Sequence, residues 1–290
     1  MAARPRTLPA AIAPVLVGTA AAIYTHGDLR RPLAFIAALI GSIFIQIGTN
    51  LANDYSDAKR GADTVDRLGP VRVTATRLVA PRSVLIATWL AFGVAVAAGI
   101  YLATVAGWII IAVGAASIAA GVLYTGGPRP YGYAGLGELF VFLFFGLVAV
   151  NGSYYVQLER LGWLPFALSV SIGCLATAIL VVNNIRDMDT DRRAGKRTLA
   201  VRIGRRPTRA VYIGLLLLAF FVALPALLTT DAPWWGGLLL GAVWALLARA
   251  PTQAVVNRTD GPSLNKALAQ TGALLGSFSL ALSAGLLIAA

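Results

Sequence analysis

Acidic residues are scarce in this chain, with 12 Asp and Glu among 290 residues against 24 Lys and Arg. Cysteine and histidine are scarcer still, because Cys174 and His26 are the single examples of each. One cysteine cannot form a disulfide within the chain, and one cysteine with one histidine cannot supply the ligands of a zinc site of the usual kind. Both kinds of site are excluded, and Cys174 is expected to be a small buried residue in an apolar helix.

Long polar stretches are also few. Hydrophobic residues make up 58% of the chain, charged residues make up 12%, and the mean hydropathy is +0.76, far from the composition of a soluble protein. The apolar runs are close to the roughly 20 residues that a helix needs to cross a membrane, and the first is interpreted as a retained helix rather than a signal peptide. The predicted fold is all-α, with residues 1–290 forming a single polytopic membrane domain. Its nine predicted transmembrane helices are 8–25, 34–54, 83–104, 107–124, 137–157, 163–184, 210–229, 234–249 and 268–289.

The distribution of cations predicts an orientation. With nine spans, the N-terminus and the segments after the second, fourth, sixth and eighth spans share one side, which holds every Lys and Arg except Arg30, Arg31 and Arg160. By the positive-inside rule the N-terminus is cytoplasmic and the C-terminus lies outside. In an eight-span alternative, 234–249 is re-entrant. Both acidic clusters then stay on the same side, and only the C-terminus changes side. The net charge of +12 therefore belongs to one membrane face, and no nucleic-acid motif accompanies it.

Two apolar runs end in clusters of Asn and Asp, both on the predicted cytoplasmic side. If the clusters are helical, each presents one acidic edge, spanning about 60° in the first and about 80° in the second: Asn50, Asp54 and Asp57, then Asn183, Asp187 and Asp191. Asp189 points about 160° away from Asp187 and is a poorer ligand candidate. Carboxylates near a bilayer are costly, so three polar groups on one face suggest neutralisation by a hard divalent cation.

The clusters belong to a weak internal repeat, with halves near 34–104 and 163–229. In each half an apolar run and its cluster are followed by a basic segment, and then by Pro81 or Pro207 at the start of the next run. The repeat predicts that the second and third spans face the sixth and seventh across a cavity. Transporters show similar repeats, so the repeat does not decide the reaction.

A diphosphate is the ligand that fits two acidic edges beneath two basic segments. Carboxylates hold Mg²⁺, the metal bridges phosphate oxygens, and nearby cations neutralise the remaining charge. The candidate substrate-binding residues in and after the clusters, and in the segment after the fourth span, are Asn50, Asn53, Asn183, Asn184, Arg60, Arg67, Arg129, Lys196 and Arg197. The alternative for each cation is a topological signal or a contact with lipid headgroups.

At this point the sequence resembles the UbiA superfamily of intramembrane prenyltransferases. Its first motif, Asn-x-x-x-Asp-x-x-(x)-Asp after the second helix, is matched by Asn50, Asp54 and Asp57, and its second, Asp-x-x-x-Asp after the sixth, by Asp187 and Asp191. The first motif closes three residues after Asp54, where many members have a four-residue step, and this shorter form is similar to the menaquinone branch. Further stretches similar to that branch are Arg4–Pro9, Asp63–Pro70, Tyr124–Pro128, Gly135–Glu138 and Gly195–Ala200.

The resemblance implies an enzyme whose nine helices surround a central cavity with a cytoplasmic cap, in the plasma membrane and in contact with membrane lipid. It would transfer a polyprenyl group from polyprenyl diphosphate to 1,4-dihydroxy-2-naphthoate, with loss of the carboxylate as CO₂, giving demethylmenaquinone. The metal ligands it implies, which are also catalytic, are Asp54, Asp57, Asp187 and Asp191. They would hold Mg²⁺ as one or two ions, with Mn²⁺ as a substitute. Asp63 lies in the capping segment, where it would order the cap or join the metal shell.

The allylic cation formed on ionisation needs a dry cavity with aromatic faces. The candidates are Tyr124, Tyr131, Tyr133, Tyr154 and Tyr155, and the resemblance to a family position singles out Tyr124 as catalytic. The alternative for each tyrosine is a place in the interfacial aromatic belt. Glu138, which opens the fifth span, also fits a purely structural role at a helix N-terminus.

Two alternatives to this function stay open. Other UbiA-type branches use 4-hydroxybenzoate, homogentisate, haem or a phosphosugar as the acceptor. In a different class, a polyprenyl-phosphate carrier or transporter would share the helices, the repeat and the basic rim without any chemistry. Both clusters at one membrane face count against a transporter, because alternating access usually places the site near the midplane.

Overall fold

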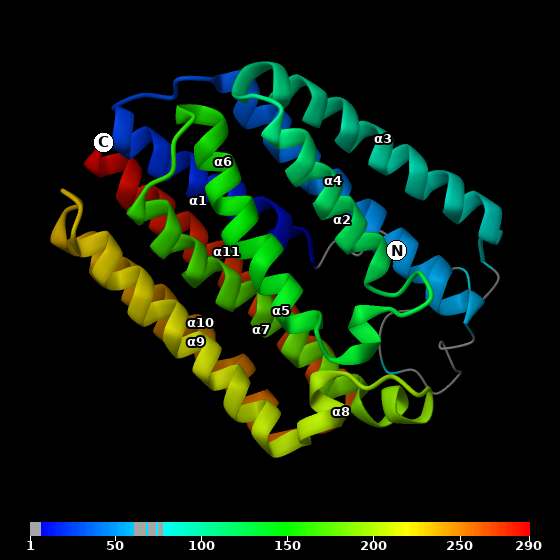
Figure 1. Ribbon diagram of the computed structural model, residues 1–290. Coiled ribbons are helices and arrows are strands. Elements are labelled where there is room, and N and C mark those ends of the chain that lie inside the picture. The colour runs from blue at the N-terminus through cyan, green and yellow to red at the C-terminus, as the bar shows by residue number, and fades with distance from the viewer. Residues whose placement is uncertain (1–6, 61–67, 69–73, 75–77) are drawn as a thin grey trace.

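The structure is a computed structural model that describes residues 7–60, 68, 74 and 78–290. Over these residues the chain is helical and contains no strand (Figure 1). Two of the predicted site residues, Asp63 and Arg67, lie outside the described residues. The elements in chain order are α1 (Leu8–His26), α2 (Pro32–Lys59), α3 (Pro81–Ala106), α4 (Ile109–Leu123), η2 (Tyr131–Ala134), α5 (Gly137–Val141), η3 (Phe142–Val148), α6 (Ala149–Leu158), α7 (Trp163–Arg193), α8 (Leu199–Ile203), α9 (Arg205–Leu228), α10 (Trp234–Asn257) and α11 (Gly261–Ala289).

Eight helices in the described part of the chain are long and apolar enough to cross a membrane, so the chain is a multi-pass membrane protein. One of the eight is the continuous helix Gly137–Leu158, in which α5, the π-helix η3 and α6 follow each other without a break. The predicted all-α membrane fold is confirmed. Prolines start several of these helices, among them α2, α3 and α11, because at the first turn a missing N–H costs no hydrogen bond.

The predicted fourth span corresponds to α4, which is apolar but has only 15 residues. Its length is about 22 Å, against about 30 Å for the hydrocarbon of a bilayer. At its start Ile110 packs with Ala34 and Ala106, and at its end Tyr124 lies beside the acidic clusters, so α4 runs between the two ends of the bundle. The count of nine membrane crossings stays a prediction that depends on α4.

Both acidic clusters are helical, because α2 and α7 continue through them to Lys59 and Arg193. The two helices have 28 and 31 residues, longer than the predicted spans. Residues 185–209, which lie between the predicted sixth and seventh spans and were expected to form a loop, are instead helical for most of their length, since the end of α7, the short helix α8 and the start of α9 occupy them. The helical extension carries the aspartates past the apolar part of each helix.

The core of the bundle is built around α7, which packs against α1, α9, α11 and η3. Close contacts are made through glycine: a Cβ added to Gly146 on η3 would lie 2.6 Å from the Cα of Gly173 on α7. Small residues of this kind let membrane helices approach closely. Cys174, next to this contact, is 1% exposed, as predicted for a small core residue.

Large apolar side chains cover the outside of the bundle. The exposed ones include Trp89 and Leu90 on α3, Trp163 on α7 and Leu246 on α10. In Figure 1, α3 lies on one flank and α9 and α10 lie on the opposite one. Apolar side chains on both flanks are what a protein surrounded by lipid requires.

Candidate active site

One cavity of about 360 Å³ brings the two acidic clusters together. The C-terminal parts of α2 and α7 form its polar end, together with the segment between α4 and α5 and the segment after α7. The polar end is lined by Asn50, Asn53, Asp57, Tyr124, Tyr131, Tyr133, Asn183, Asn184, Asp187, Asp191, Lys196 and Thr198. The expectation that the two clusters share one site is therefore met by the geometry.

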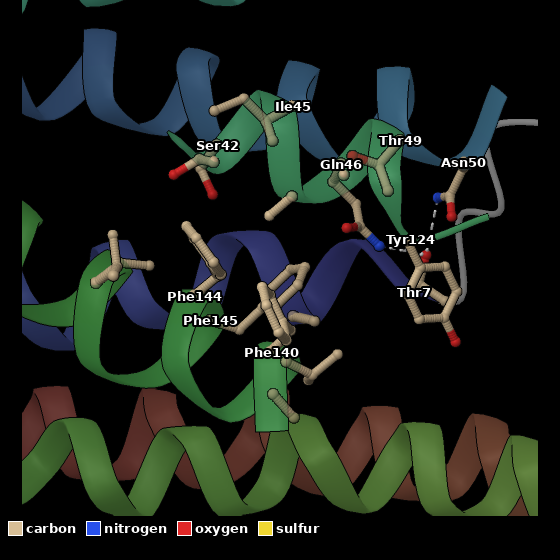
Figure 2. Close-up of a pocket in the computed structure, with 18 of the residues that line it drawn as sticks. Thr7, Ser42, Ile45, Gln46, Thr49, Asn50, Tyr124, Phe140, Phe144 and Phe145 are labelled. Atoms are coloured by element: carbon tan, nitrogen blue, oxygen red, sulfur yellow. Dashed lines mark hydrogen bonds between the residues drawn. The ribbon is translucent and has the colours of Figure 1, made fainter. Parts of the chain in front are cut away.

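The rest of the cavity is largely apolar. Phe140, Phe144 and Phe145 form one wall from the helix that contains η3, and Figure 2 shows them facing Ser42 and Ile45. The rings of Tyr131 and Phe140 stack with centroids 4.0 Å apart, so the aromatic wall reaches the polar end. A ligand with a charged head and a long apolar tail matches this division.

The repeat places its helices only partly as predicted. Residues of α2, α3 and α7 line the cavity, whereas α9 contributes none of the lining residues and packs against α7. The prediction that the sixth and seventh spans both face the cavity is therefore wrong for the seventh. Since α7 is central in the bundle, its other faces are taken up by the core.

Hydrogen bonds fix the asparagines of the first cluster. The amide nitrogens of Asn50 and Gln46 donate to the Thr7 hydroxyl at 3.2 and 3.0 Å, as the dashed lines in Figure 2 show. The Thr125 hydroxyl donates to Oδ1 of Asn53 at 2.9 Å. Residues at the start of α1 and just after α4 thus hold three side chains of α2 in place.

Asp54 differs from the other predicted ligands, because it is not among the residues that line the cavity. It is 2% exposed, and its Oδ1 accepts a hydrogen bond from the Thr74 backbone N–H at 3.1 Å. On the helix, Asn53 lies about 60° to one side of Asn50 and Asp54 lies about 40° to the other. The cavity lies on the Asn53 side of α2. A role for Asp54 as a metal ligand therefore stays a prediction.

Asp57 is held by groups from two other segments. Its Oδ1 accepts a hydrogen bond from the Tyr133 hydroxyl at 2.7 Å and lies 3.2 Å from the Lys196 ammonium. Lys196 also lies over the Tyr133 ring, 4.7 Å from its centroid, and its backbone N–H donates to the Asp191 carbonyl at 2.8 Å. The lysine predicted to bind substrate therefore neutralises an aspartate of the first cluster.

In the second cluster, Asp187 forms a bidentate ion pair with its neighbour Arg186. Nε and a terminal nitrogen of Arg186 lie 2.8 and 2.6 Å from the two carboxylate oxygens. The same guanidinium donates to Asn183 at 2.7 Å and to Asn265 on α11 at 2.8 Å. Arg186 is 2% exposed, so this is a buried cation paired with a buried carboxylate.

The other asparagine of this cluster, Asn184, is held by the fifth predicted span. Its amide nitrogen donates to Oε1 of Glu138 at 2.7 Å. Asp191 lines the cavity two turns further along α7. Asp189, predicted to point away, is exposed and pairs with Arg205 at 3.0 Å.

Two tyrosines meet at the polar end. The rings of Tyr124 and Tyr131 make an edge contact with centroids 5.5 Å apart, and the Tyr131 hydroxyl donates to the Ala120 carbonyl at 2.8 Å. Burial raises the pKa of Tyr131, so its hydroxyl stays protonated. Of the other candidates, Tyr133 lines the cavity, whereas Tyr154 and Tyr155 do not.

Three of the predicted cations are exposed and do not line the cavity: Arg60, Arg129 and Arg197. The Arg60 guanidinium donates to the Gly127 carbonyl and lies 5.9 Å from the centre of the Tyr133 ring. The Arg197 backbone N–H donates to the Tyr133 carbonyl at 3.0 Å. Arg60 and Arg197 therefore lie next to Tyr133, and binding of substrate by the side chains of all three arginines stays a prediction.

Sequence reasoning missed the partners of the motif residues. The contacts of Arg186 with Asn265 and of Glu138 with Asn184 join residues 79 and 46 positions apart in the sequence. Glu138 did carry a signal, since a lone carboxylate beginning an apolar span needs a partner. For Asn265 the sequence offers no comparable signal.

The oxygen donors at the polar end fit a magnesium ion that also binds phosphate. Within the described residues, no group of three or more Asp, Glu, His or Cys is gathered as a metal site. Mg²⁺ is usually held by one or two carboxylates together with substrate phosphates and water, so it does not require such a group. Asp57, Asp187 and Asp191, with the nearby asparagine oxygens, are suited to this shared coordination.

Comparison with known proteins agrees with the motifs. The family model described as "UbiA prenyltransferase family" matches residues 11–268. The 1,4-dihydroxy-2-naphthoate octaprenyltransferase of Mycobacterium tuberculosis is 45% identical over 284 residues, which cover 98% of this chain and 94% of that protein. The enzyme of the same name from Mycobacterium leprae is 41% identical, over 99% of this chain and 95% of that protein.

The fold also has a solved counterpart. The structure of a UbiA homolog from Archaeoglobus fulgidus bound to DMAPP and Mg²⁺ matches with a TM-score of 0.65 and 12% identity, over 97% of each chain. At this identity the likeness concerns the fold alone. The family match over most of the chain and the similarity to full-length relatives agree with the two motifs and the shared cavity, and the chain belongs to the UbiA prenyltransferase family.

Proposed function

We propose that this protein transfers a polyprenyl group from polyprenyl diphosphate to 1,4-dihydroxy-2-naphthoate, with loss of the naphthoate carboxylate as CO₂. The immediate product is the dihydroxy form of demethylmenaquinone, in the biosynthesis of menaquinone. The acceptor follows from the names of the full-length relatives, which are 1,4-dihydroxy-2-naphthoate octaprenyltransferases. Other UbiA-type acceptors are the alternative.

The observation that carries the proposal is a single cavity with two unlike ends. The polar end has carboxylates from both helices, Lys196, and the asparagines beside them, while the remainder is largely apolar and aromatic. A polyprenyl diphosphate has the same division between an anionic head and a hydrocarbon tail. The head is therefore assigned to the polar end and the first isoprene units to the aromatic wall.

The residues of the chain have distinct tasks in this proposal. Asp57, Asp187 and Asp191 would hold Mg²⁺, an ion that the Archaeoglobus fulgidus homolog binds together with DMAPP. When bound, the ion neutralises the diphosphate and so favours cleavage of the C–O bond. Lys196 lies at Asp57 and is placed to contact the same anion. The proposal includes one or two bound ions, with Mn²⁺ as a substitute for Mg²⁺.

The aromatic wall protects the electron-poor carbon. When the C–O bond breaks, the electron pair leaves with the diphosphate and an allylic cation remains, which water would quench. Tyr124, Tyr131 and Phe140 border the polar end with their rings, and ring faces stabilise cations. The apolar lining excludes water until a ring carbon of the acceptor forms the new C–C bond.

The cellular arrangement is proposed from charge. The cations outside the membrane helices concentrate at the end of the bundle that contains the acidic clusters, which predicts a cytoplasmic N-terminus and site. The C-terminus is then outside, and the membrane is the plasma membrane. The polyprenyl donor and the surrounding lipid meet the protein within the bilayer.

Mass spectrometry of products tests the function. Purified protein in nanodiscs receives 1,4-dihydroxy-2-naphthoate, a polyprenyl diphosphate and Mg²⁺, with EDTA in a parallel sample. The expected product has gained the prenyl mass, has lost CO₂ and is absent with EDTA. Release of diphosphate without prenylated naphthoate would contradict the acceptor. Folded protein that changes neither compound would favour a non-catalytic polyprenyl-phosphate carrier.

A further inference from the structure

Glu138 is a buried carboxylate with an incomplete set of partners. Its side chain is 9% exposed at the start of the helix Gly137–Leu158, and Oε1 accepts the hydrogen bond from Asn184. Oε2 is buried and has no hydrogen-bond partner among the described residues. A buried acid without a cationic partner is costly, so the position calls for a reason beyond packing.

The contact with Glu138 determines which way the amide of Asn184 points. The donor in this contact is Nδ2 of Asn184, and Oε1 of Glu138 accepts the hydrogen bond. Asn184 also lines the polar end of the cavity. Because its nitrogen is committed to Glu138, the carbonyl oxygen Oδ1 is the acceptor that remains for a ligand.

The first cluster repeats this arrangement in the same register. Asn50 and Asp57 are seven residues apart on α2, and Asn184 and Asp191 are seven apart on α7; a step of seven brings two residues within about 20° on a helix. All four residues line the cavity. The amide nitrogen of Asn50 also donates to a residue of another element, the Thr7 hydroxyl. Each helix thus has an amide and a carboxylate seven residues apart among the residues that line the cavity.

We propose that Glu138 is a positioning residue that holds Asn184 with its carbonyl oxygen toward the polar end, where that oxygen is a ligand for the magnesium–diphosphate. The inference rests on the proposed function, which supplies the diphosphate. In it, Asn184 and Asp191 form a pair of ligands that corresponds to Asn50 and Asp57. Glu138 does not itself touch the substrate, in agreement with its absence from the cavity lining.

Magnesium binding tests this without any acceptor. Isothermal titration of Mg²⁺ into protein with geranyl thiolodiphosphate, an analogue that resists ionisation, gives the Mg²⁺ Kd. Residues that orient a metal ligand usually change metal affinity by 10–100-fold, so Glu138→Ala is expected to raise the Kd by roughly that factor. Glu138→Gln keeps an acceptor oxygen, and its Kd is expected to rise by less than about tenfold.

A donor–acceptor exchange separates orientation from packing. Asn184→Asp places two carboxylates against each other and is expected to weaken Mg²⁺ binding by more than about tenfold. In the double variant Glu138→Gln/Asn184→Asp the Gln nitrogen donates to the new carboxylate, and the Kd is expected to return toward the wild-type value. Glu159→Gln is the matched control, because Glu159 is the other glutamate of the chain, and it pairs with Arg31 at the far end of the bundle. Its Kd is expected to be unchanged.

Three results would overturn the inference: folded Glu138→Ala protein with the wild-type Kd, a double variant that binds no better than Asn184→Asp, or a double variant that does not fold although Asn184→Asp does. Folding is followed by thermal unfolding and gel filtration in detergent. If wild-type protein does not bind the analogue with Mg²⁺, the proposed function fails instead. If the aromatic acceptor is not 1,4-dihydroxy-2-naphthoate, the titration is unaffected, because it contains no acceptor.

Discussion

At the scale of residues, the carboxylates of the site are neutralised by cations of the same chain. Asp57 lies 3.2 Å from Lys196, and Asp187 is paired with Arg186. Removing one partner of a buried ion pair typically costs about 3–5 kcal/mol, because a charge is left without a partner. These cations let acidic clusters be stable near a bilayer, and they are already close to where a diphosphate would bind.

Lys196→Met tests this double role, since methionine preserves most of the side-chain length and removes the charge. We expect a lower thermal unfolding midpoint in EDTA, because Asp57 loses a cation, and partial recovery with Mg²⁺, which would replace it. The KM for polyprenyl diphosphate is expected to rise about 10–100-fold, as for the loss of one hydrogen bond to a charged group. The measurements are thermal unfolding and initial rates.

Lys266→Met is the control for this variant, because Lys266 is an exposed lysine on α11 outside the cavity. It is expected to leave the unfolding midpoint and the KM unchanged. A Lys196→Met protein with wild-type stability in EDTA and wild-type KM would show that the contact with Asp57 has neither role.

The motif residues could be predicted from sequence, and their partners could not. Spacing along a helix places Asn50 and Asp57, or Asp187 and Asp191, on one edge, because that geometry is local. The lysine at Asp57 and the glutamate at Asn184 come from other segments, and only the packing of the bundle brings them there. The same limit applies to Asp54. It lies on the predicted edge of α2, but its carboxylate accepts a hydrogen bond from the Thr74 backbone N–H.

At the scale of elements, the π-helix η3 shapes the apolar part of the cavity. It interrupts an otherwise α-helical span, and Phe144 and Phe145 on it line the cavity. Its opposite contact is with α7, where Gly146 meets Gly173. π-Segments inside α-helices are frequent at functional sites, since the extra residue re-aims the side chains around it.

Gly146→Ala tests the contact that fixes this segment. The new Cβ would lie 2.6 Å from the Gly173 Cα and 2.7 Å from the Ser169 carbonyl oxygen, so the backbone must shift. Overpacking of this kind typically costs about 1–3 kcal/mol of unfolding free energy. We expect a lower thermal unfolding midpoint, and lower prenyl transfer because the two phenylalanines move with the helix.

Gly214→Ala on α9 is the matched control, since a Cβ there meets nothing within 4 Å. A gain of up to about 1 kcal/mol is expected from helix propensity. If Gly146→Ala were as stable and as active as this control, the close approach of η3 and α7 would have no part in shaping the cavity.

The helices themselves were predictable because lipid demands long apolar runs. The apolar runs did not indicate how far α2 and α7 continue. Hydropathy falls at the two clusters, but both helices extend through them to Lys59 and Arg193. The π-segment was also not predicted, because residues 142–148 are apolar and contain no proline or charged residue that would mark a break in the helix.

At the scale of the whole molecule, the two ends of the bundle differ. The acidic clusters, Lys196 and the residue that begins the described chain, Thr7, lie at one end. Figure 1 places the C-terminus at the other end. This arrangement requires an odd number of crossings, and α4 and α10 decide the count. The 24 residues of α10 are enough to cross, which favours the nine-span reading over a re-entrant one.

Cysteine labelling tests the count and the orientation together. The native Cys174 is 1% exposed, so a wild-type background that reacts little is expected. Arg129→Cys, Asp231→Cys and Ala290→Cys place single thiols at exposed positions after α4, after α9 and at the C-terminus. Under nine crossings with the site in the cytoplasm, a membrane-impermeant maleimide labels positions 231 and 290 in intact spheroplasts and position 129 only after lysis. If α10 were re-entrant, position 290 would also require lysis. Labelling of position 129 from outside, together with protection of position 231, would contradict either the crossing of α4 or the predicted orientation.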